Sequence, residues 1–211
     1  MGHSQQFGGK RHMTRDYASL SRKDALLLAA KELFGQHGYA ETTFKKISEK
    51  AGVALGLLTH HYGSKENLFL AAGLDVLDSF VRVLRSACKG TPDGRTGVHA
   101  YCRAYLDFSI DPDSHWLVLV RCSPFSDMKT SAGHDVMTEK FSEVLTALEE
   151  QLERGQRDGS LRPMESAEVA QVILAMMVGA NRTRLLTPYG SPGLYAETLD
   201  MVDRAVAACY A

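Results

Sequence analysis

Cysteine is scarce in this chain, and its few cysteines lie far apart. The four of them form no CxxC pair: Cys88, Cys102, Cys122 and Cys209. Because structural zinc sites and thioredoxin-like motifs both need closely spaced cysteines, neither is encoded. The adjacent His60 and His61 do not replace them, since neighbours on a helix point about 100° apart and no Cys or Glu follows at ligand spacing. We expect no metal site and no cofactor.

Long apolar runs are also missing. The longest strongly apolar stretch, residues 169–180, is too short to cross a bilayer as a helix. The N-terminus has no apolar segment followed by a small-residue cleavage site. We therefore expect a soluble cytoplasmic protein with no membrane partner.

The common catalytic motifs are missing as well. The chain has no Gly-x-Ser-x-Gly, no phosphate-binding glycine loop, no dinucleotide-binding fingerprint and no paired-carboxylate spacing. Isolated Ser, His and Asp residues occur in any chain of 211 residues and do not indicate catalysis. We expect no catalytic residues and no enzyme.

Alternating strand patterns of useful length are absent, and helical periodicity takes their place. Hydrophobic residues make up 45% of the chain and charged residues 23%, so a packed core is expected. The fold is therefore predicted to be all-α. Beyond residue 90, turn residues separate five expected helices, at about 95–110, 113–122, 133–157, 166–186 and 192–209.

The first ninety residues have clear helix signals. Ser21 and Asp24 form a capping box that opens a helix, and Gly38 is expected to end it. Ser64 is the expected N-cap of a longer helix that continues to about Ala87. That helix begins in the head and runs into the body, so it is a candidate lever between them. Three parts result, a flexible N-terminal segment, a three-helix head and a helical body, at residues 1–20, 21–66 and 67–211.

Two short helical patterns joined by a tight turn lie in the second half of the head. The first places four residues on one face: Phe44, Ile47, Ser48 and Ala51. Gly52 permits a sharp exit, because it adopts positive φ without a Cβ penalty. Val53, Leu57 and Leu58 are then expected to face inward. Four residues remain on a surface that a DNA groove would meet: Ala54, Leu55, Thr59 and His60. The pattern is typical of a helix-turn-helix and predicts DNA binding.

Charge is unevenly distributed along the chain. Residues 1–65 contain ten Lys/Arg and five Asp/Glu, whereas residues 66–211 contain fourteen and twenty, although the whole chain has a net charge of only −1. A cationic head attracts the polyphosphate backbone of DNA by releasing condensed counterions. A chance bias on a solvated surface is the alternative explanation of this distribution.

Residues 21–68 resemble the DNA-binding domain of the TetR family of transcriptional regulators. The resemblance rests on positions in the family's order and spacing: Gly38-Tyr39, Thr42-Thr43, Ile47, Ala51-Gly52-Val53, Gly56, Leu58, His61-Tyr62 and Lys65 to Leu68. It implies about nine helices, a homodimer formed by the last two, and a recognition helix at about residues 54–60. It also implies a palindromic DNA operator, a small-molecule effector that releases the operator, and repression as the usual outcome.

The same resemblance assigns roles to individual residues. Thr43, Tyr62 and Lys65 match positions that usually hold phosphates, and Leu55 and Thr59 match positions that face the major groove. His60 also matches a groove-facing position. Ala54 stands where the family frequently has Ser, and Thr59 stands where it often has an aromatic residue.

Aromatic residues in the body fall at helical spacing. Tyr101, Tyr105 and Phe108 lie at i, i+4 and i+7, so their rings share one face. They are expected to line an effector pocket together with residues from other segments: Phe80, Trp116, Arg121, Phe125, Met128 and Met176. An aromatic stripe of this kind is equally typical of a packed core.

Residues 169–180 are apolar nearly all round, and a helix with two apolar faces needs two packing partners. One face is expected to meet a second subunit, with Ala175 and Gly179 permitting close contact across a twofold axis. Val178 and Arg182 complete the expected interface. A fully intramolecular core is the competing explanation.

Two alternatives to a ligand-responsive repressor remain open. One is a helical small-molecule-binding protein or enzyme without sequence-specific DNA binding. The other is a nucleoid-type DNA binder that has no ligand and little sequence preference. A symmetric DNA consensus would separate a regulator from both.

Overall fold

The computed structural model describes residues 17–121 and 131–208. In these ranges it contains nine α-helices and no β-strand beyond one bridge between Leu161 and Ala207, which confirms the all-α prediction. The first helices are η1 (Tyr17–Ser19), α1 (Arg22–Glu41), α2 (Phe44–Ala51), α3 (Leu55–Tyr62) and α4 (Lys65–Cys88). The remainder are α5 (Gly94–Ile110), η2 (Pro112–Ser114), α6 (Leu117–Arg121), α8 (Ser131–Asp158), α9 (Ser166–Leu186) and α10 (Leu194–Val206).

The predicted helix ends of the head follow from local capping. The Ser21 side chain accepts a hydrogen bond from the backbone N–H of Asp24, as the capping box predicted. Gly38 has a φ of 79°, so the regular helix ends there, and the next three residues form only an irregular extension of α1. The Thr42 hydroxyl closes this end by donating to the carbonyls of Leu33 and Gly38.

Two predictions about the body helices were wrong in detail. The expected helix at 113–122 is split, because His115 adopts a left-handed conformation with a φ of 54° between η2 and α6. The last helix stops at Val206 instead of residue 209, since Ala207 leaves the helix and pairs with Leu161. The helices expected at 95–110, 133–157 and 166–186 match α5, α8 and α9 to within two residues.

The head is a small bundle of α1, α2 and α3, closed by the first turns of α4. Its fully buried side chains come from all four helices and include Leu26, Phe34, Ile47, Leu58 and Leu68. The Phe34 ring meets that of Phe69 on α4 edge to face, with their centroids 5.2 Å apart. Because α4 contributes to this core, its start is fixed relative to the head.

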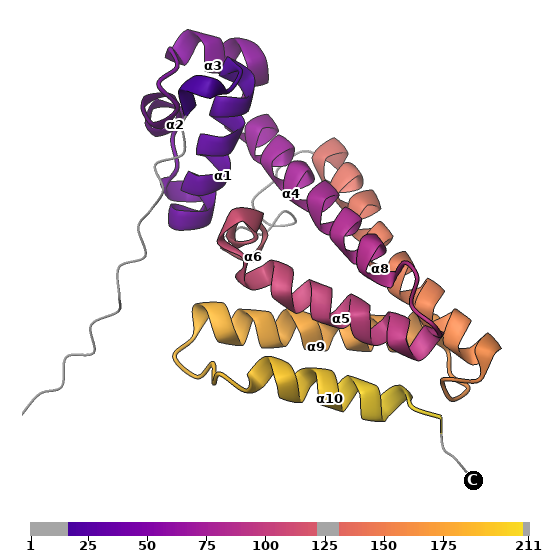
Figure 1. Cartoon of the computed structure of the whole chain (residues 1–211). Helices are drawn as coiled ribbons and strands as arrows, with labels where there is room; N and C mark the ends of the chain where they lie inside the picture. Colours follow the sequence, from indigo (N-terminus) through magenta and orange to yellow (C-terminus); the bar gives the residue numbers. More distant parts are fainter. Residues whose placement is uncertain (1–16, 122–130, 209–211) are drawn as a thin grey trace, which may run out of the picture.

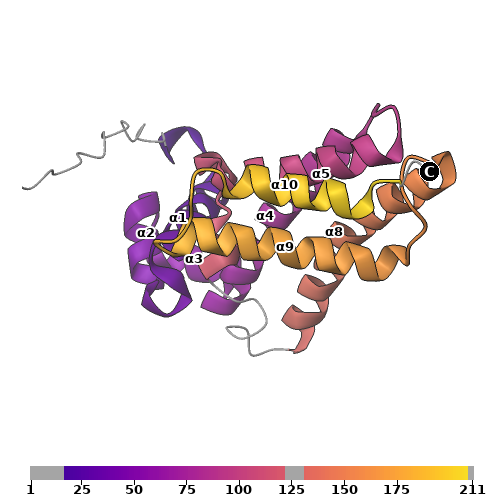
Figure 2. The ribbon, with the colours of Figure 1, turned by 90° about the horizontal axis from the view of Figure 1, so that it is seen from below.

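Helix α4 then runs away from the head into the body, where it packs against α5 and α8 (Figure 1). The expected domain boundary at residue 66 falls in the first turn of this continuous helix. Helices α9 and α10 lie side by side on one face of the body (Figure 2). In the described ranges, none of the helices combines the length and apolar character needed to span a membrane.

Candidate nucleic-acid interface and effector core

The second helix of the motif, α3, presents one face to solvent. Leu55 is 49% exposed, and Ala54, Thr59 and His60 are also exposed, so all four residues predicted to face DNA lie on the outside. Leu58, by contrast, is fully buried against the head. Helix α3 is therefore anchored by one face and free to enter a groove with the other.

The turn before α3 has the geometry that the sequence predicted. Gly52 has a φ of 64°, and its N–H is directed at the carbonyls of Ser48 and Glu49 at the end of α2. Val53 is buried and fixes the start of the next segment. The prediction that Leu57 faces inward was wrong, because its side chain is 41% exposed. A helix of eight residues meets the head along a narrow stripe, which Leu58 already occupies.

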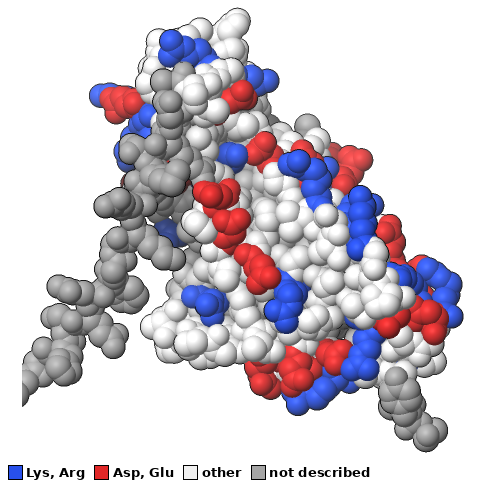
Figure 3. Space-filling model, viewed as in Figure 1, with Lys and Arg blue, Asp and Glu red and all other residues white. Residues whose placement is uncertain are grey.

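The first turn of α2 adds polar groups beside α3. Thr43 is the N-cap of α2, and its exposed hydroxyl accepts from the backbone N–H of Lys46. Lys45 follows with a side chain that is 80% exposed and only a loose contact of 3.9 Å to Glu49. Lys45 was not among the residues predicted to bind DNA, although the basic pair Lys45-Lys46 lies two residues after Thr43. Figure 3 shows Lys and Arg side chains together with some Asp and Glu side chains over the head, and both signs of charge along the body.

Two residues expected to hold phosphates make internal contacts instead. The Tyr62 ring is buried, and its hydroxyl donates to the carbonyl of Lys23 on α1. Burial raises the pKa of Tyr62 to about 12, so it stays neutral. Lys65 donates to the carbonyls of Tyr39 and Thr42 at 2.7 and 3.0 Å, and its ammonium lies 4.2 Å from the Tyr39 ring centroid. Both side chains hold the head together, and their phosphate roles stay predictions.

The aromatic residues of the body meet in one buried cluster. Phe80 on α4 contacts the rings of Tyr105, Phe108 and Trp116, with centroids 5.0, 5.1 and 4.6 Å apart. Tyr101 is also fully buried, and its hydroxyl donates to the carbonyl of Val144 on α8. The expected pocket lining is thus a set of closely packed rings, which we call the aromatic cluster: Phe80, Tyr105, Phe108 and Trp116.

Other expected pocket residues lie elsewhere. Arg121 is exposed and donates from Nη1 to the carbonyl of Gln36 on α1, 2.7 Å away, so it faces the head and not the cluster. Met176 on α9 is half-buried and packs against the hydrophobic core. Phe125 and Met128 lie outside the described residues, and their expected roles stay predictions.

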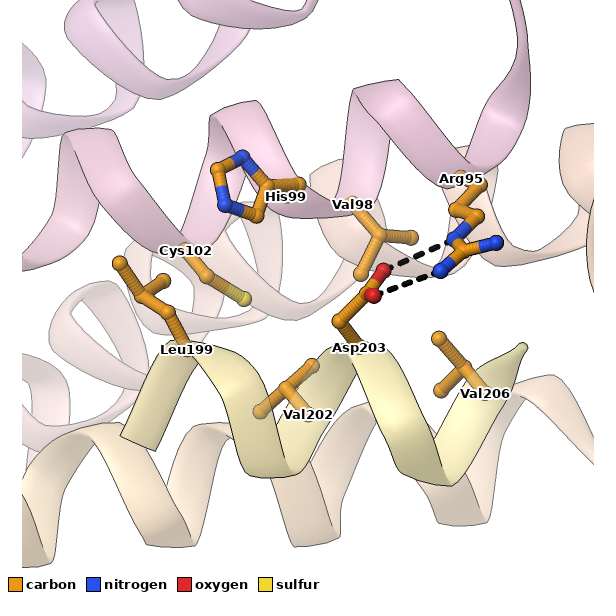
Figure 4. A pocket seen from close by; sticks show the side chains of 8 residues that line it. All are labelled: Arg95, Val98, His99, Cys102, Leu199, Val202, Asp203 and Val206. Carbon is orange, nitrogen blue, oxygen red and sulfur yellow. Dashed lines mark hydrogen bonds and ion pairs between the residues drawn. The ribbon is translucent and has the colours of Figure 1, made fainter. Parts of the chain in front are cut away.

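The space between α5 and α10 is closed. Its apolar side chains pack against each other, and the carboxylate of Asp203 forms a two-bond ion pair with Arg95, at 2.6 and 2.8 Å (Figure 4). The seam leaves no room for a water molecule. An open groove of about 370 Å³ lies at the far end of α4, lined in part by Arg85, Lys89 and Glu150. None of the residues that line the groove was predicted to bind the effector.

One face of α9 has no partner within the described part of the chain. Val172 is 60% exposed and Val178 is 41% exposed, and Ala175 and Gly179 are exposed between them. A Cβ built on Gly179 would meet nothing within 4 Å. Arg182 is also exposed, but its Nη1 donates to the carbonyl of Val120 at the end of α6. The expected interface residues therefore share an outer surface.

A helix-turn-helix head with an outward second helix, carried on a helical body, is the architecture of a helix-turn-helix transcriptional regulator. The sequence profile described as "Bacterial regulatory proteins, tetR family" matches residues 26–72. The HTH-type transcriptional repressor KstR2 of Rhodococcus jostii is 30% identical over 156 residues, which cover 71% of this chain and 72% of that protein. The chain belongs to the TetR family and is a helix-turn-helix transcriptional regulator.

Two further comparisons extend the likeness beyond the head. The HTH-type transcriptional activator FasR of Mycolicibacterium smegmatis is 29% identical over 185 residues, 86% of this chain and 80% of that protein. A transcriptional regulator from Saccharomonospora viridis, solved in complex with choline, superimposes with a TM-score of 0.79 at 16% identity, covering 89% of this chain and 98% of that one. The structural likeness shows the shared fold alone.

Proposed function

We propose that two copies of this chain bind a palindromic DNA operator, repress transcription there, and leave the operator when a small molecule occupies the body. The single observation that carries the proposal is the outer face of α3, where Leu55, Thr59 and His60 are exposed together. An apolar side chain at such a position suits thymine methyls, and Thr or His suits base edges. Thr43 and Lys45 beside α3 are suited to the flanking phosphates.

The dimer is proposed to form through α9 and α10. The unpartnered face of α9 carries Val172 and Val178, and Met201 on the neighbouring helix α10 is 50% exposed. Apolar side chains at this exposure favour burial against a second copy, and open space above Gly179 permits a close approach of helices. A twofold axis here would present two copies of α3 to successive major grooves.

Helix α6 is the proposed connection between the body and the head. Leu117 on α6 lies against Gly35 of α1. A Cβ added to Gly35 would be 3.3 Å from the Cβ of Leu117. Arg121 at the other end of α6 binds the Gln36 carbonyl. Since Trp116 directly precedes α6 and belongs to the aromatic cluster, a ligand in the cluster would move α6 and, with it, α1. Release follows if the ligand prefers the state with wrongly spaced α3 helices.

Selection of bound sequences from random duplex DNA tests the DNA-binding part. The expected result is a consensus with twofold symmetry. Changing Leu55 or Thr59 to Ala should alter the preferred bases, whereas Thr146→Glu on the outer face of α8 should leave the consensus unchanged. Recovery of unrelated sequences without symmetry would contradict the proposal.

The direction of regulation needs its own experiment, because the relatives carry both repressor and activator names. Transcription in vitro from a promoter that contains the selected consensus should fall when the protein is added. An increase in transcript would show activation and overturn repression while leaving operator binding intact.

A further inference from the structure

Two buried polar atoms lie in or against the aromatic cluster, and neither has a partner among the residues that the structure describes. They are the indole Nε1 of Trp116, whose residue is 6% exposed, and the amide Oδ1 of Asn181, whose residue is 2% exposed. Nearly all buried polar groups in proteins are hydrogen-bonded, so a buried pair of this kind is unusual and indicates a role outside the packed core.

The two groups are connected through one side chain. The Tyr105 ring lies 5.6 Å from that of Trp116, centroid to centroid, and the nearby Asn181 side chain partly offsets the rise in the pKa of Tyr105 that burial causes. Rotation of an amide exchanges its oxygen and nitrogen, so one polar group of Asn181 faces away from Tyr105 in either orientation. The cluster therefore offers one indole donor and one amide group from two different segments.

No ionised side chain belongs to the aromatic cluster. Phe80, Phe108 and Trp116 cannot ionise, and burial raises the pKa of Tyr105 well above its usual value, so it is neutral too. An anion placed among these rings would have no opposite charge, and an unpaired buried charge is strongly unfavourable. Ring faces attract cations, but a quaternary ammonium ion accepts no hydrogen bond and would leave Trp116 Nε1 without a partner. A neutral molecule would meet no such penalty.

Trp116 also lies at a break in the backbone between two helical segments. It follows His115, whose φ of 54° is uncommon for a residue with a Cβ, and it precedes the short helix α6. A rotation at this point would separate the Trp116 ring from Phe80 and open a space beside both unpaired groups. The same rotation would shift α6 against α1.

We propose that the effector is an uncharged, mainly apolar molecule that accepts a hydrogen bond from Trp116 Nε1 and pairs with the amide of Asn181. This inference rests on the proposed effector-controlled regulation and specifies the chemical class of the effector. A neutral aromatic or alicyclic compound with a carbonyl or carboxamide group fits these requirements. A carboxylate brings an unpaired charge, and a quaternary ammonium ion cannot accept the hydrogen bond from Trp116 Nε1, so neither meets both requirements.

Five benzene derivatives of similar size test the class directly: acetophenone, benzamide, ethylbenzene, benzoate and benzyltrimethylammonium. Calorimetric titration of the full chain without DNA should show millimolar or tighter binding of acetophenone and benzamide, and binding of benzoate and benzyltrimethylammonium that is at least about tenfold weaker. Trp116 is the only tryptophan, so the neutral probes should also change the intrinsic fluorescence.

Two variants separate the hydrogen bonds from general packing. Trp116→Phe should weaken the binding of acetophenone by about tenfold and leave the binding of ethylbenzene nearly unchanged, because the indole N–H is lost and an aromatic ring is kept. Asn181→Leu should remove the advantage of benzamide over acetophenone. Tyr189→Phe, at a site 82% exposed, is the control and should change nothing. Unfolding by urea checks that each variant is folded.

Binding of either charged probe as tightly as acetophenone would overturn the proposal, as would failure of both neutral probes to bind. The outcome is independent of DNA binding. If no consensus is selected from random DNA and the neutral probes still bind through Trp116 and Asn181, the regulator proposal fails and the ligand assignment stands.

Discussion

Gly52 is one of the positions in the head where the backbone conformation favours glycine. Its φ of 64° is open to glycine at little cost, whereas alanine there is expected to lose about 1 kcal/mol in the free energy of unfolding. Gly56 on α3 is the matched control, because it is helical and nothing lies within 4 Å of an added Cβ. Gly56→Ala should stabilise by up to about 1 kcal/mol. Urea unfolding of both variants measures the difference, and equal effects would contradict this account.

Lys65 and Lys45 are expected to contribute to different properties, Lys65 to the stability of the head and Lys45 to DNA binding. Lys65→Ala removes bonds to the Tyr39 and Thr42 carbonyls and is expected to lower the unfolding free energy by about 1–2 kcal/mol. Lys45→Ala should leave stability nearly unchanged, since the side chain is exposed. It should reduce the salt slope of operator binding by about one unit. Denaturation and binding across salt concentrations distinguish them, and a larger slope change for Lys65 would reverse the assignment.

Helix α6 is five residues long, and two hydrogen bonds to backbone carbonyls lie at its end. Arg121 donates to the carbonyl of Gln36, and Arg182 donates to the carbonyl of Val120. Arg121→Ala removes the bond to the Gln36 carbonyl of α1, and it is expected to leave operator affinity within about twofold while making release by effector about fivefold less sensitive. Arg157→Ala is the control, because Arg157 is exposed and pairs with Glu153 in its own helix. If the Arg121 variant releases the operator at the same effector concentration as the natural sequence, the contact between α6 and α1 does not transmit the effector signal.

The contact of α5 with α10 should depend on pH. Hydrogen bonds from Arg95, with a smaller contribution from the charge of His99, lower the pKa of Asp203 below its usual value of 3.8. The ionised carboxylate therefore stabilises the fold above about pH 4, and this stabilisation is lost as pH falls through the lowered pKa. Asp203→Asn should cost about 1 kcal/mol near pH 7 and much less below pH 3. Urea unfolding at both values tests it, and a pH-independent difference would contradict it.

Helices with strong capping and periodic signals could be predicted from the sequence, and those set by tertiary contacts could not. Ser21, Gly38, Gly52 and Ser64 marked their helix ends because each side chain or missing Cβ acts on its own backbone. The left-handed His115 gave no comparable signal, because a non-glycine residue reaches that conformation only through its surroundings.

The candidate site was predictable to the same degree. The outer residues of α3 followed from helical spacing and a known motif, whereas Leu57 was misplaced because spacing alone does not tell how wide the head's contact stripe is. Lys65 was expected at DNA from the family resemblance, and Arg121 was expected at the ligand as a polar group of the pocket; these roles stay predictions. The long side chains of both residues reach backbone carbonyls of α1, and sequence does not record such distant partners.

The molecule combines a cationic head, a long connecting helix and an exposed apolar face. These three features would act together in operator binding only if two copies associate. A lone head of this size has one α3 and reads one half-site. Pairing through α9 and α10 would bring two heads to a fixed separation, and α4 and α6 would carry changes in the body to that separation. The oligomeric state is therefore the property on which operator recognition depends.

Gly179→Glu tests that dependence. The variant places a charge and a larger side chain where a Cβ now meets open space, so the monomer fold should be kept while close approach of a second α9 is blocked. Sedimentation velocity should show a dimer for the natural sequence and a monomer for the variant, and operator affinity should fall by more than about a hundredfold, since each half-site is then bound alone. Thr146→Glu adds the same charge to an exposed position on α8 and should leave both properties unchanged. If Gly179→Glu sediments as a dimer and still binds the full operator, the two copies meet through some other surface.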